Sequence, residues 1–229
     1  MEVTELSDKC MITLVFCGSA VGEFLPPQIM YKGKTKRCHP KFTFPLDWHI
    51  TQSPNHWSTE NTMVEYIQNI NVPYVKSCRN LIGDDSKAAL VIMDNFKGQT
   101  TPAINQLLEE NNIDVSLLPA NTTDKLQPMD LSINRPAKAF LKCKFEEWYC
   151  QQITDQLLDV DDVELQPVDL TLGVLKELGG KWMVEMVEYI CKNPQFIVNG
   201  FIKAGILAAL DGEDTDDNSP GNCRGSGEV

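Results

Sequence analysis

Apolar, β-branched and polar residues near the start of the chain follow a pattern typical of strands. An apolar run at 11–17 ends in the turn sequence Gly-Ser-Ala-Val-Gly, and a second apolar segment at 24–31 continues to Gly33. Two such segments joined by a glycine-containing turn predict an antiparallel hairpin. The stretch at 40–54 holds aromatic residues and prolines without any period, so we expect irregular structure there.

Residues 88–118 predict a strand–helix–strand unit. Residues 88–93 form a continuous apolar run, which is typical of a strand that is buried on both faces. A helical pattern at 102–111 leads to a second apolar run at 113–118. Because a helix joins two strands that are so close in sequence, we expect the strands to be parallel.

The remaining apolar positions recur at helical spacing. They predict helices at about 59–70, 131–152, 170–191 and 196–210. Gly179-Gly180 predicts a break within the third of these helices. Trp57, Trp148 and Trp182 stand at helical positions, where tryptophan more often belongs to the core than to a platform for stacking bases.

The composition is that of a chain with a buried core, with 42% apolar and 23% charged residues. No apolar run approaches the roughly 18–20 residues of a membrane span, and the acidic N-terminus is unlike a secretory signal. We therefore expect an unexported protein with no membrane contact. The cysteines include no Cys-x-x-Cys pair and the histidines complete no finger spacing, so we expect free thiols and no zinc site.

The net charge of −12 is unevenly distributed. Residues 1–150 carry 15 basic and 17 acidic residues, whereas residues 151–229 carry 5 and 15. A local basic run stands out in the first part and consists of Lys32, Lys34, Lys36, Arg37 and Lys41. These cations predict contacts with nucleic-acid phosphates. Composition alone is equally compatible with a solvated hairpin edge that lysines keep soluble.

Two acidic residues follow the predicted parallel strands. Asp94 stands directly after the first strand, at the edge of a sheet where ligands commonly bind, although Asp94-Asn95 could simply turn the chain. Asp130 follows the second strand and precedes a helix, so an N-cap role is the alternative. Because parallel strands end at the same edge, the two carboxylates could share Mg²⁺, as in two-metal phosphoryl transfer.

Three sequence strings carry a family resemblance. They are Val-Ile-Met-Asp-Asn at 91–95, Ile-Asp-Val-Ser-Leu-Leu-Pro-Ala-Asn-Thr-Thr at 113–123 and Leu-Gln-Pro-Met-Asp-Leu-Ser-Ile-Asn-Arg-Pro at 126–136. Together they resemble the DDE superfamily endonuclease domain of pogo/Tigger-type transposases, whose relatives include jerky and centromere-protein-B-like proteins. With weaker likenesses upstream and downstream, the resemblance covers roughly residues 10–207.

The resemblance implies an α/β fold, a ribonuclease-H-like mixed sheet with flanking helices, and metal-dependent DNA strand cleavage and transfer. We place the DDE domain at residues 1–152 and an acidic helical C-terminal part of the same domain at 153–210. Residues 211–229 are rich in acidic residues and glycine and have no large apolar residue before Val229, so their composition predicts a disordered acidic tail. Asp94 matches the second acidic metal ligand and Asp130 the third. Mg²⁺ or Mn²⁺ is the implied cofactor if the site functions, and no cofactor is expected otherwise.

The first acid of the family's site has no counterpart in this chain. In the family it lies on a first strand upstream of the segment matched by 12–17, and Asp8 does not match its position. We therefore expect a domain that is incomplete at its N-terminus and lacks its first strand, which leaves two sheet edges uncovered. We also expect no counterpart of the family's N-terminal helix-turn-helix segments.

Three hypotheses follow. The first is a nuclear, transposase-derived nucleic-acid-binding protein that does not transpose, with DNA as its partner. The second is an active metal-dependent endonuclease or transposase, which needs a third carboxylate from Glu23, Asp47 or a partner chain. The third is a protein-interaction module in which the acidic C-terminal part, with Trp148, Trp182 and Tyr189, docks a protein partner or a second copy of the chain.

Overall fold

The structure is a computed structural model that describes residues 12–96, 98, 100–119, 122–158 and 165–211. In chain order its elements are β1 (Ile12–Val15), β2 (Gln28–Lys32), the 3-10 helix η2 (Lys36–Cys38), β3 (His49–Ser53), α1 (Glu60–Tyr66), the π-helix η3 (Ile67–Asn71), α2 (Val72–Ile82), β4 (Ala89–Met93), α3 (Pro102–Glu110), β5 (Ile113–Leu117), α4 (Thr123–Leu126), α5 (Pro128–Ser132), α6 (Asn134–Leu158), α7 (Leu172–Cys191), α8 (Gln195–Lys203) and α9 (Ile206–Asp211).

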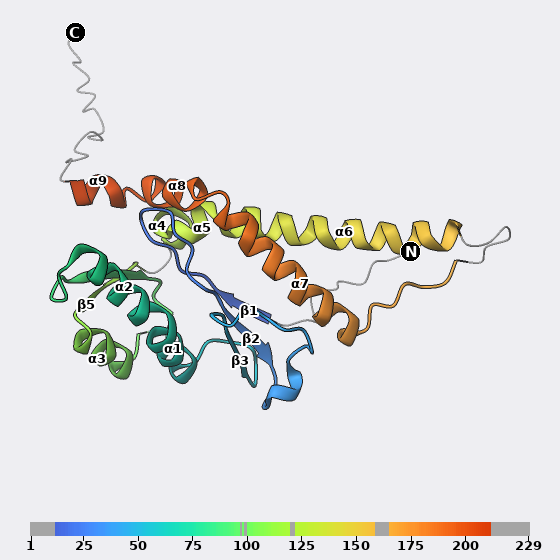
Figure 1. Cartoon of the computed structure of the whole chain (residues 1–229), viewed down its shortest axis with the longest axis horizontal. Helices are drawn as coiled ribbons and strands as arrows, with labels where there is room; N and C mark the ends of the chain where they lie inside the picture. Colours follow the sequence, from blue (N-terminus) through green and yellow to red (C-terminus); the bar gives the residue numbers. More distant parts are fainter. Residues whose placement is uncertain (1–11, 97, 99, 120–121, 159–164, 212–229) are drawn as a thin grey trace, which may run out of the picture.

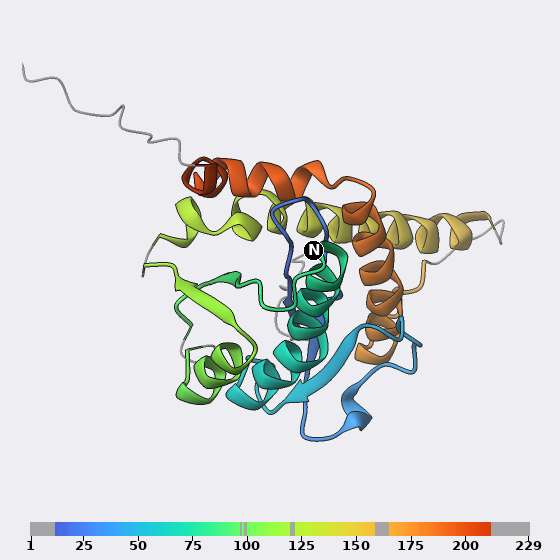
Figure 2. The same ribbon diagram turned by 60° about the vertical axis from the view of Figure 1, so that its left-hand side comes forward.

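The fold is mixed α/β, and its described strands form two separate small sheets. β1 pairs antiparallel with β2, β2 pairs parallel with β3, and β4 pairs parallel with β5. Helices α5 to α9 lie along one side of the molecule and α1 to α3 along the other (Figure 1). The turned view shows β4 and β5 apart from the three-stranded sheet (Figure 2). The resemblance implies one mixed sheet, whereas the described strands form two, and β1 and β4 each present an open edge.

The predicted hairpin is confirmed, because Ile12 pairs with Tyr31 and Val15 with Gln28. Its second strand, β2, is buried on both faces. Ile29 and Tyr31 pack with Met183 of α7, while on the opposite face the Gln28 side-chain Nε2 donates to the Thr62 carbonyl at 2.7 Å. The neighbouring β3 lies in the stretch at 40–54 that we expected to be irregular, so that expectation is wrong for residues 49–53. These residues form a strand because they pair with β2, and their own sequence has no apolar period that would reveal it.

The predicted strand–helix–strand unit is also confirmed, with parallel strands and a connecting helix that Thr101 caps. The expectation that its first strand is buried on both faces is wrong, because Leu90 is 53% exposed. No described strand covers the outer edge of β4. Arg79 of α2, itself buried, fixes the start of both strands by donating to the carbonyl oxygens of Lys87, Asn111 and Asn112.

Two predicted helices extend further than expected. The helix expected at 59–70 continues through η3 and α2 to Ile82. Pro73 is the second residue of α2, just beyond the π turn, and its missing N–H removes one helical hydrogen bond at this point. The helix expected at 131–152 consists of α5 and then α6, which continues to Leu158 and so crosses the boundary placed at residue 152.

The predicted break at Gly179-Gly180 is wrong, because α7 runs through both residues without interruption. A Cβ at Gly180 would lie 2.9 Å from the Phe42 ring, so the missing side chain serves close packing. The last predicted helix is divided into α8 and α9 at Gly205, whose φ of 71° is left-handed. The predicted tail lies outside the described residues apart from position 211, which ends α9.

The three tryptophans expected in the core differ in their surroundings. Trp148 of α6 and Trp182 of α7 pack edge to face with ring centroids 6.1 Å apart, and so belong to the contact between these helices. Trp57 lies ahead of α1 in a loop and is 54% exposed, which corrects its assignment to the core. Among the described residues, no helix is both long and apolar enough to cross a bilayer.

Candidate active site and nucleic-acid interface

Asp94 follows β4 immediately, as the sequence predicts, and its side chain is half-buried. Burial raises the pKa of the Asp94 carboxyl above its ordinary value, a hydrogen bond from the Phe96 backbone N–H lowers it, and the negative charge of Asp130 raises it again. The two carboxylates are therefore near enough to interact. One oxygen of Asp94, Oδ1, is buried without a hydrogen-bond partner among the described residues.

Asp130 occupies the first turn of α5. Its Oδ1 accepts a hydrogen bond from Asn134 Nδ2, four residues further along. Gln127, and not Asp130, is the N-cap of α5, so the alternative role considered for Asp130 does not apply. Asn134 holds Asp130 in place, and the i to i+4 spacing is the only sequence feature that could have indicated this contact.

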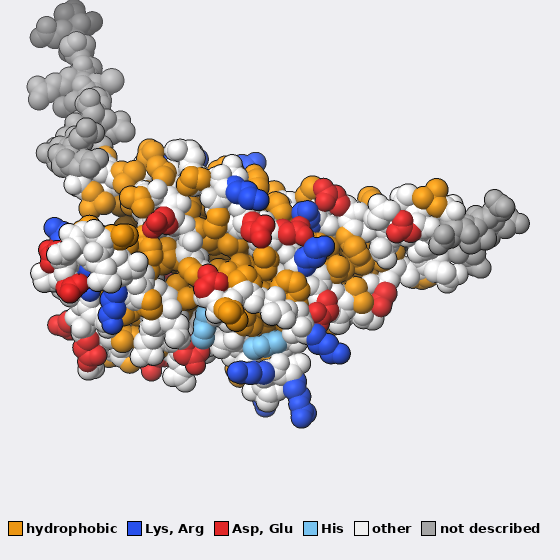
Figure 3. Space-filling view, in the orientation of Figure 1, with side chains coloured by type: hydrophobic (Ala, Val, Ile, Leu, Met, Phe, Trp, Pro, Cys, Tyr) orange, Lys and Arg blue, Asp and Glu red, His pale blue; other side chains and the backbone are white. Residues whose placement is uncertain are grey.

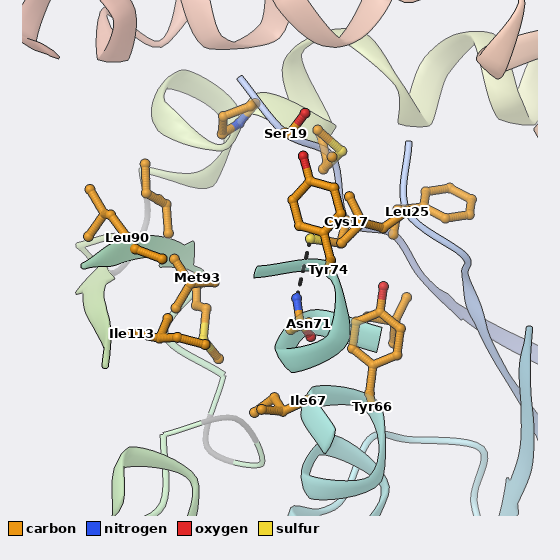
Figure 4. A pocket seen from close by; sticks show the side chains of 18 of the residues that line it. Cys17, Ser19, Leu25, Tyr66, Ile67, Asn71, Tyr74, Leu90, Met93 and Ile113 are labelled. Carbon is orange, nitrogen blue, oxygen red and sulfur yellow. Dashed lines mark hydrogen bonds between the residues drawn. The ribbon is translucent and has the colours of Figure 1, made fainter. Parts of the chain in front are cut away.

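A cavity of about 610 Å³ separates the two sheets next to Asp94. Residues 13–17 of the hairpin line one side and residues 88–94 line the other, so the cavity lies between the open edges of β1 and β4. Figure 4 shows Cys17 and Leu25 facing Leu90 and Met93 across this space, with Tyr74 and Asn71 between them. The lining is mainly apolar.

Several polar atoms that line this cavity lack partners in the described part of the chain. They are Asp94 Oδ1, Asn71 Oδ1, Gln127 Oε1 and Ser58 Oγ. Buried polar atoms are usually hydrogen-bonded, so a group of them along one cavity marks a place where donors would be accommodated. Asp94, with its unpaired oxygen, and Asp130 supply carboxylates, the ligands that a hard divalent cation prefers.

No third acidic residue joins Asp94 and Asp130. Within the described ranges no group of three His, Cys, Asp or Glu side chains could hold a metal ion. The Glu23 carboxylate accepts a hydrogen bond from the Tyr74 hydroxyl at 2.5 Å, and Asp47 is exposed in the loop before β3. Asp8 lies outside the described residues.

The predicted basic run is exposed at the end of β2 and in the segment that follows. Figure 3 shows Lys and Arg side chains gathered at this lower end of the molecule. In the described part of the chain no carboxylate forms an ion pair with Lys34, Lys36, Arg37 or Lys41. The segment is fixed to α7, because Lys176 Nζ donates to the Cys38 carbonyl at 2.6 Å and the Lys41 N–H donates to Glu177 at 2.5 Å.

The fold and the carboxylate pair define the class as a mixed α/β domain with an acidic site at the carboxyl end of a parallel strand pair. The family model described as DDE superfamily endonuclease matches residues 9–167, which is more than half of the chain. The chain belongs to this family.

Two curated relatives are each named "Pogo transposable element with KRAB domain". The human protein is 24% identical over 207 residues and the mouse protein 23% over 206, each match covering 90% of this chain. The human "Pogo transposable element with ZNF domain" is 26% identical over 123 residues, covering 54% of this chain and 8% of that protein. The chain spans 31% of the length of the first two relatives. No solved structure gives a significant match.

Proposed function

We propose that the chain is a transposase-derived nucleic-acid-binding protein whose endonuclease domain is degenerate and not competent for transposition. The observation that carries the proposal is the incomplete acidic site. Asp94 and Asp130 interact beside a cavity between two open strand edges, and no described third carboxylate joins them. Membership of an endonuclease family supports DNA as the nucleic acid concerned.

The cavity lies where one further strand of the family's fold would fit, because no described strand covers the facing edges of β1 and β4. A strand paired with both β1 and β4 would join the two sheets into the single mixed sheet that the ribonuclease-H-like resemblance implies. It would also offer backbone N–H groups close to the unpaired oxygens of Asn71, Asp94 and Gln127. We infer that a strand carrying the third acidic residue would belong in this space.

Mg²⁺ or Mn²⁺, if the site retains one, would be held by Asp94 and Asp130. Such an ion supplies activation of the attacking oxygen and stabilisation of the leaving oxygen in phosphoryl transfer. Asn134 orients Asp130, and the half-buried position of Asp94 limits its solvation. Two carboxylates bind a divalent ion more weakly than three, which is the physical reason for expecting little or no cleavage.

The basic run supports a surface that contacts nucleic-acid phosphates. Its side chains project into solvent from a segment that α7 holds in place, so the cations are available to phosphates without a large change of the backbone. Binding of chromosomal DNA would place the protein in the nucleus of a eukaryotic cell.

Calorimetric titration of Mg²⁺ and Mn²⁺ and a plasmid-nicking assay test the degenerate site. We compare the unchanged chain with Asp94→Asn and Asp130→Asn, and with Asp114→Asn as a control that removes an equal charge from the start of β5. The proposal predicts no nicking by any of them. Mg²⁺-dependent nicking that Asp94→Asn and Asp130→Asn abolish and Asp114→Asn preserves would establish the active-endonuclease alternative instead.

The salt dependence of duplex DNA binding tests the nucleic-acid interface. The triple variant Lys34→Gln, Lys36→Gln, Arg37→Gln should lower the slope of log K against log salt by roughly 2–3, because each phosphate contact contributes about 0.9. The matched control replaces Lys138, Lys192 and Lys203, which are exposed on the helical layer. Equal slopes for the two triple variants would contradict the assignment of the basic run.

A further inference from the structure

Three aromatic rings form a row beside the acidic site. The ring centroids of His56 and Trp57 are 5.5 Å apart with planes inclined by 28°, and those of Trp57 and Phe96 are 6.2 Å apart with planes inclined by 19°. Although two rings lie against it, Trp57 remains 54% exposed. A large aromatic surface left open in a fixed, stacked arrangement can accept a further planar group.

The row is held rigidly from the side of the three-stranded sheet. Ser53 Oγ donates to the Trp57 carbonyl at 2.9 Å, and Thr13 Oγ1 lies 3.0 Å from His56 Nδ1. His56 has a φ of 60°, in the left-handed region that few non-glycine residues adopt. Backbone of this kind persists only where its surroundings fix it, and it is enriched at functional sites.

The loop after β4 supports the row from the other side. Phe96 lies two residues beyond Asp94, and its backbone N–H bonds to that carboxylate. A Cβ at Gly98 would lie 2.8 Å from the Ser58 carbonyl and 2.9 Å from the Phe96 ring, so this loop packs tightly on the segment that carries Trp57. The three rings are therefore preorganised, and they join the two sheets at the edge where Asp94 lies.

The row also lies beside the start of the basic run. Lys32 pairs with Ser53 across β2 and β3, and the Gly33 N–H donates to the Ser53 carbonyl at 2.9 Å. Ser53 in turn binds Trp57. Cations, aromatic rings and a carboxylate thus follow one another along one edge of the molecule. Cations beside an open aromatic face are the combination that binds the backbone and bases of single-stranded nucleic acid.

We propose that Trp57, flanked by His56 and Phe96, is a stacking platform for an unpaired nucleobase of a nucleic-acid strand whose phosphates lie along the basic run. This inference rests on the proposed nucleic-acid-binding function and adds the kind of strand that the site selects. A nucleobase, rather than an aromatic side chain of a partner protein, is the occupant because the basic run, which begins beside the row at Lys32, matches a phosphate backbone. Stacking accepts every base, so sequence preference should be weak.

The test measures the anisotropy of a labelled oligothymidylate of about 20 nucleotides and of a labelled duplex of the same length. Trp57→Ala should weaken single-strand binding roughly 5- to 150-fold, the range of one base stacked on an aromatic ring. Trp57→Phe should keep most of the affinity. Duplex binding should be unaffected by Trp57→Ala, because the bases of a duplex remain paired and its phosphates supply the contacts.

Tyr189→Ala is the matched control, since Tyr189 is a partly exposed aromatic residue that stacks on Phe140 away from the basic run. It should leave both affinities unchanged. A second readout is intrinsic tryptophan fluorescence, which the oligothymidylate should quench in the unchanged chain and much less in Trp57→Phe.

The outcomes separate this inference from the proposed function. If the unchanged chain binds neither probe, the nucleic-acid-binding function fails and the platform with it. If it binds both, but Trp57→Ala binds the single strand as tightly as the unchanged chain, the platform alone is overturned. Equal losses for single strand and duplex, with a lowered melting temperature, would assign Trp57 a structural role and also overturn the inference.

Discussion

Gly200 of α8 packs against α5, the helix that carries Asp130, and replacing it with alanine should loosen that helix. A Cβ at position 200 would overlap the Pro128 carbonyl oxygen and the Ser132 hydroxyl, and would lie 3.0 Å from the Pro128 carbonyl carbon. Pro128 is the first residue of α5, and its carbonyl belongs to the backbone, so it cannot rotate away. The two helices must therefore move apart to admit the methyl group.

Two opposing effects determine the size of the change. Alanine is the better helix former in α8 by about 1 kcal/mol. Inserting a methyl group into a packed contact costs about 1–3 kcal/mol, and the upper end applies because backbone atoms receive it. The expected net loss is about 2 kcal/mol, which in a domain of this size lowers the melting temperature by about 4–8 °C.

Thermal unfolding followed by circular dichroism measures this difference, and Gly179→Ala provides the control. Gly179 also lies inside a helix, but a Cβ there would have no atom within 4 Å. That variant should gain up to about 1 kcal/mol from helix propensity alone. If the two variants shifted the melting temperature in the same direction and by the same amount, the argument from packing against α5 would be refuted.

Two further predictions concern a buried arginine and a buried thiol. Arg79→Met should reduce the free energy of unfolding by about 3 kcal/mol, because it leaves three backbone carbonyls at the starts of β4 and β5 without their charged donor. Urea denaturation measures this loss. A loss no larger than that caused by Arg135→Met, at an exposed position, would contradict the prediction. Burial raises the pKa of Cys17 to about 11, only partly offset by a hydrogen bond from Asn71, so about one thiol in a thousand is ionised at pH 8. Iodoacetamide should therefore alkylate the exposed Cys150 long before Cys17. The alkylation rate at Cys17 should rise about tenfold per pH unit below pH 11. Comparable rates for the two thiols at pH 8 would show that the raised pKa of Cys17 is wrong.

The sequence predicts those elements whose stability is local. The hairpin of β1 and β2, the helix α3 and the parallel pair β4 and β5 follow from apolar periodicity and turn residues, and the structure has them nearly at the predicted bounds. β3 has no such local pattern, because it is a strand only through its pairing with β2. The burial of β4 was mispredicted because a continuous apolar run does not reveal whether a neighbouring strand is present to cover its edge.

The candidate site likewise has parts that the sequence predicts and parts that it does not. Asp94 and Asp130 can be named from their positions after the two strands and from the family strings, and the basic run is visible in the charge pattern. The contact between Trp57 and Phe96 could not be foreseen, because it joins a loop of the three-stranded sheet to the loop after β4. Nothing in either local sequence indicates that the two loops meet, and only the packing around the glycine at position 98 brings them together.

The same contact explains how the cations and the carboxylates can act on one ligand although they belong to different sheets. The basic run is attached to β2 and α7, whereas Asp94 is attached to β4, and among the described strands no backbone hydrogen bond connects these two bodies across the cavity. Near Asp94 the two are joined by Trp57 resting on Phe96 and by the close packing of Gly98 against the Ser58 carbonyl. A strand of nucleic acid lying along this edge would bind both bodies at once. Its binding should therefore depend on the contact between Trp57 and Phe96 as well as on the cations, because that contact sets the position of one body relative to the other at this edge.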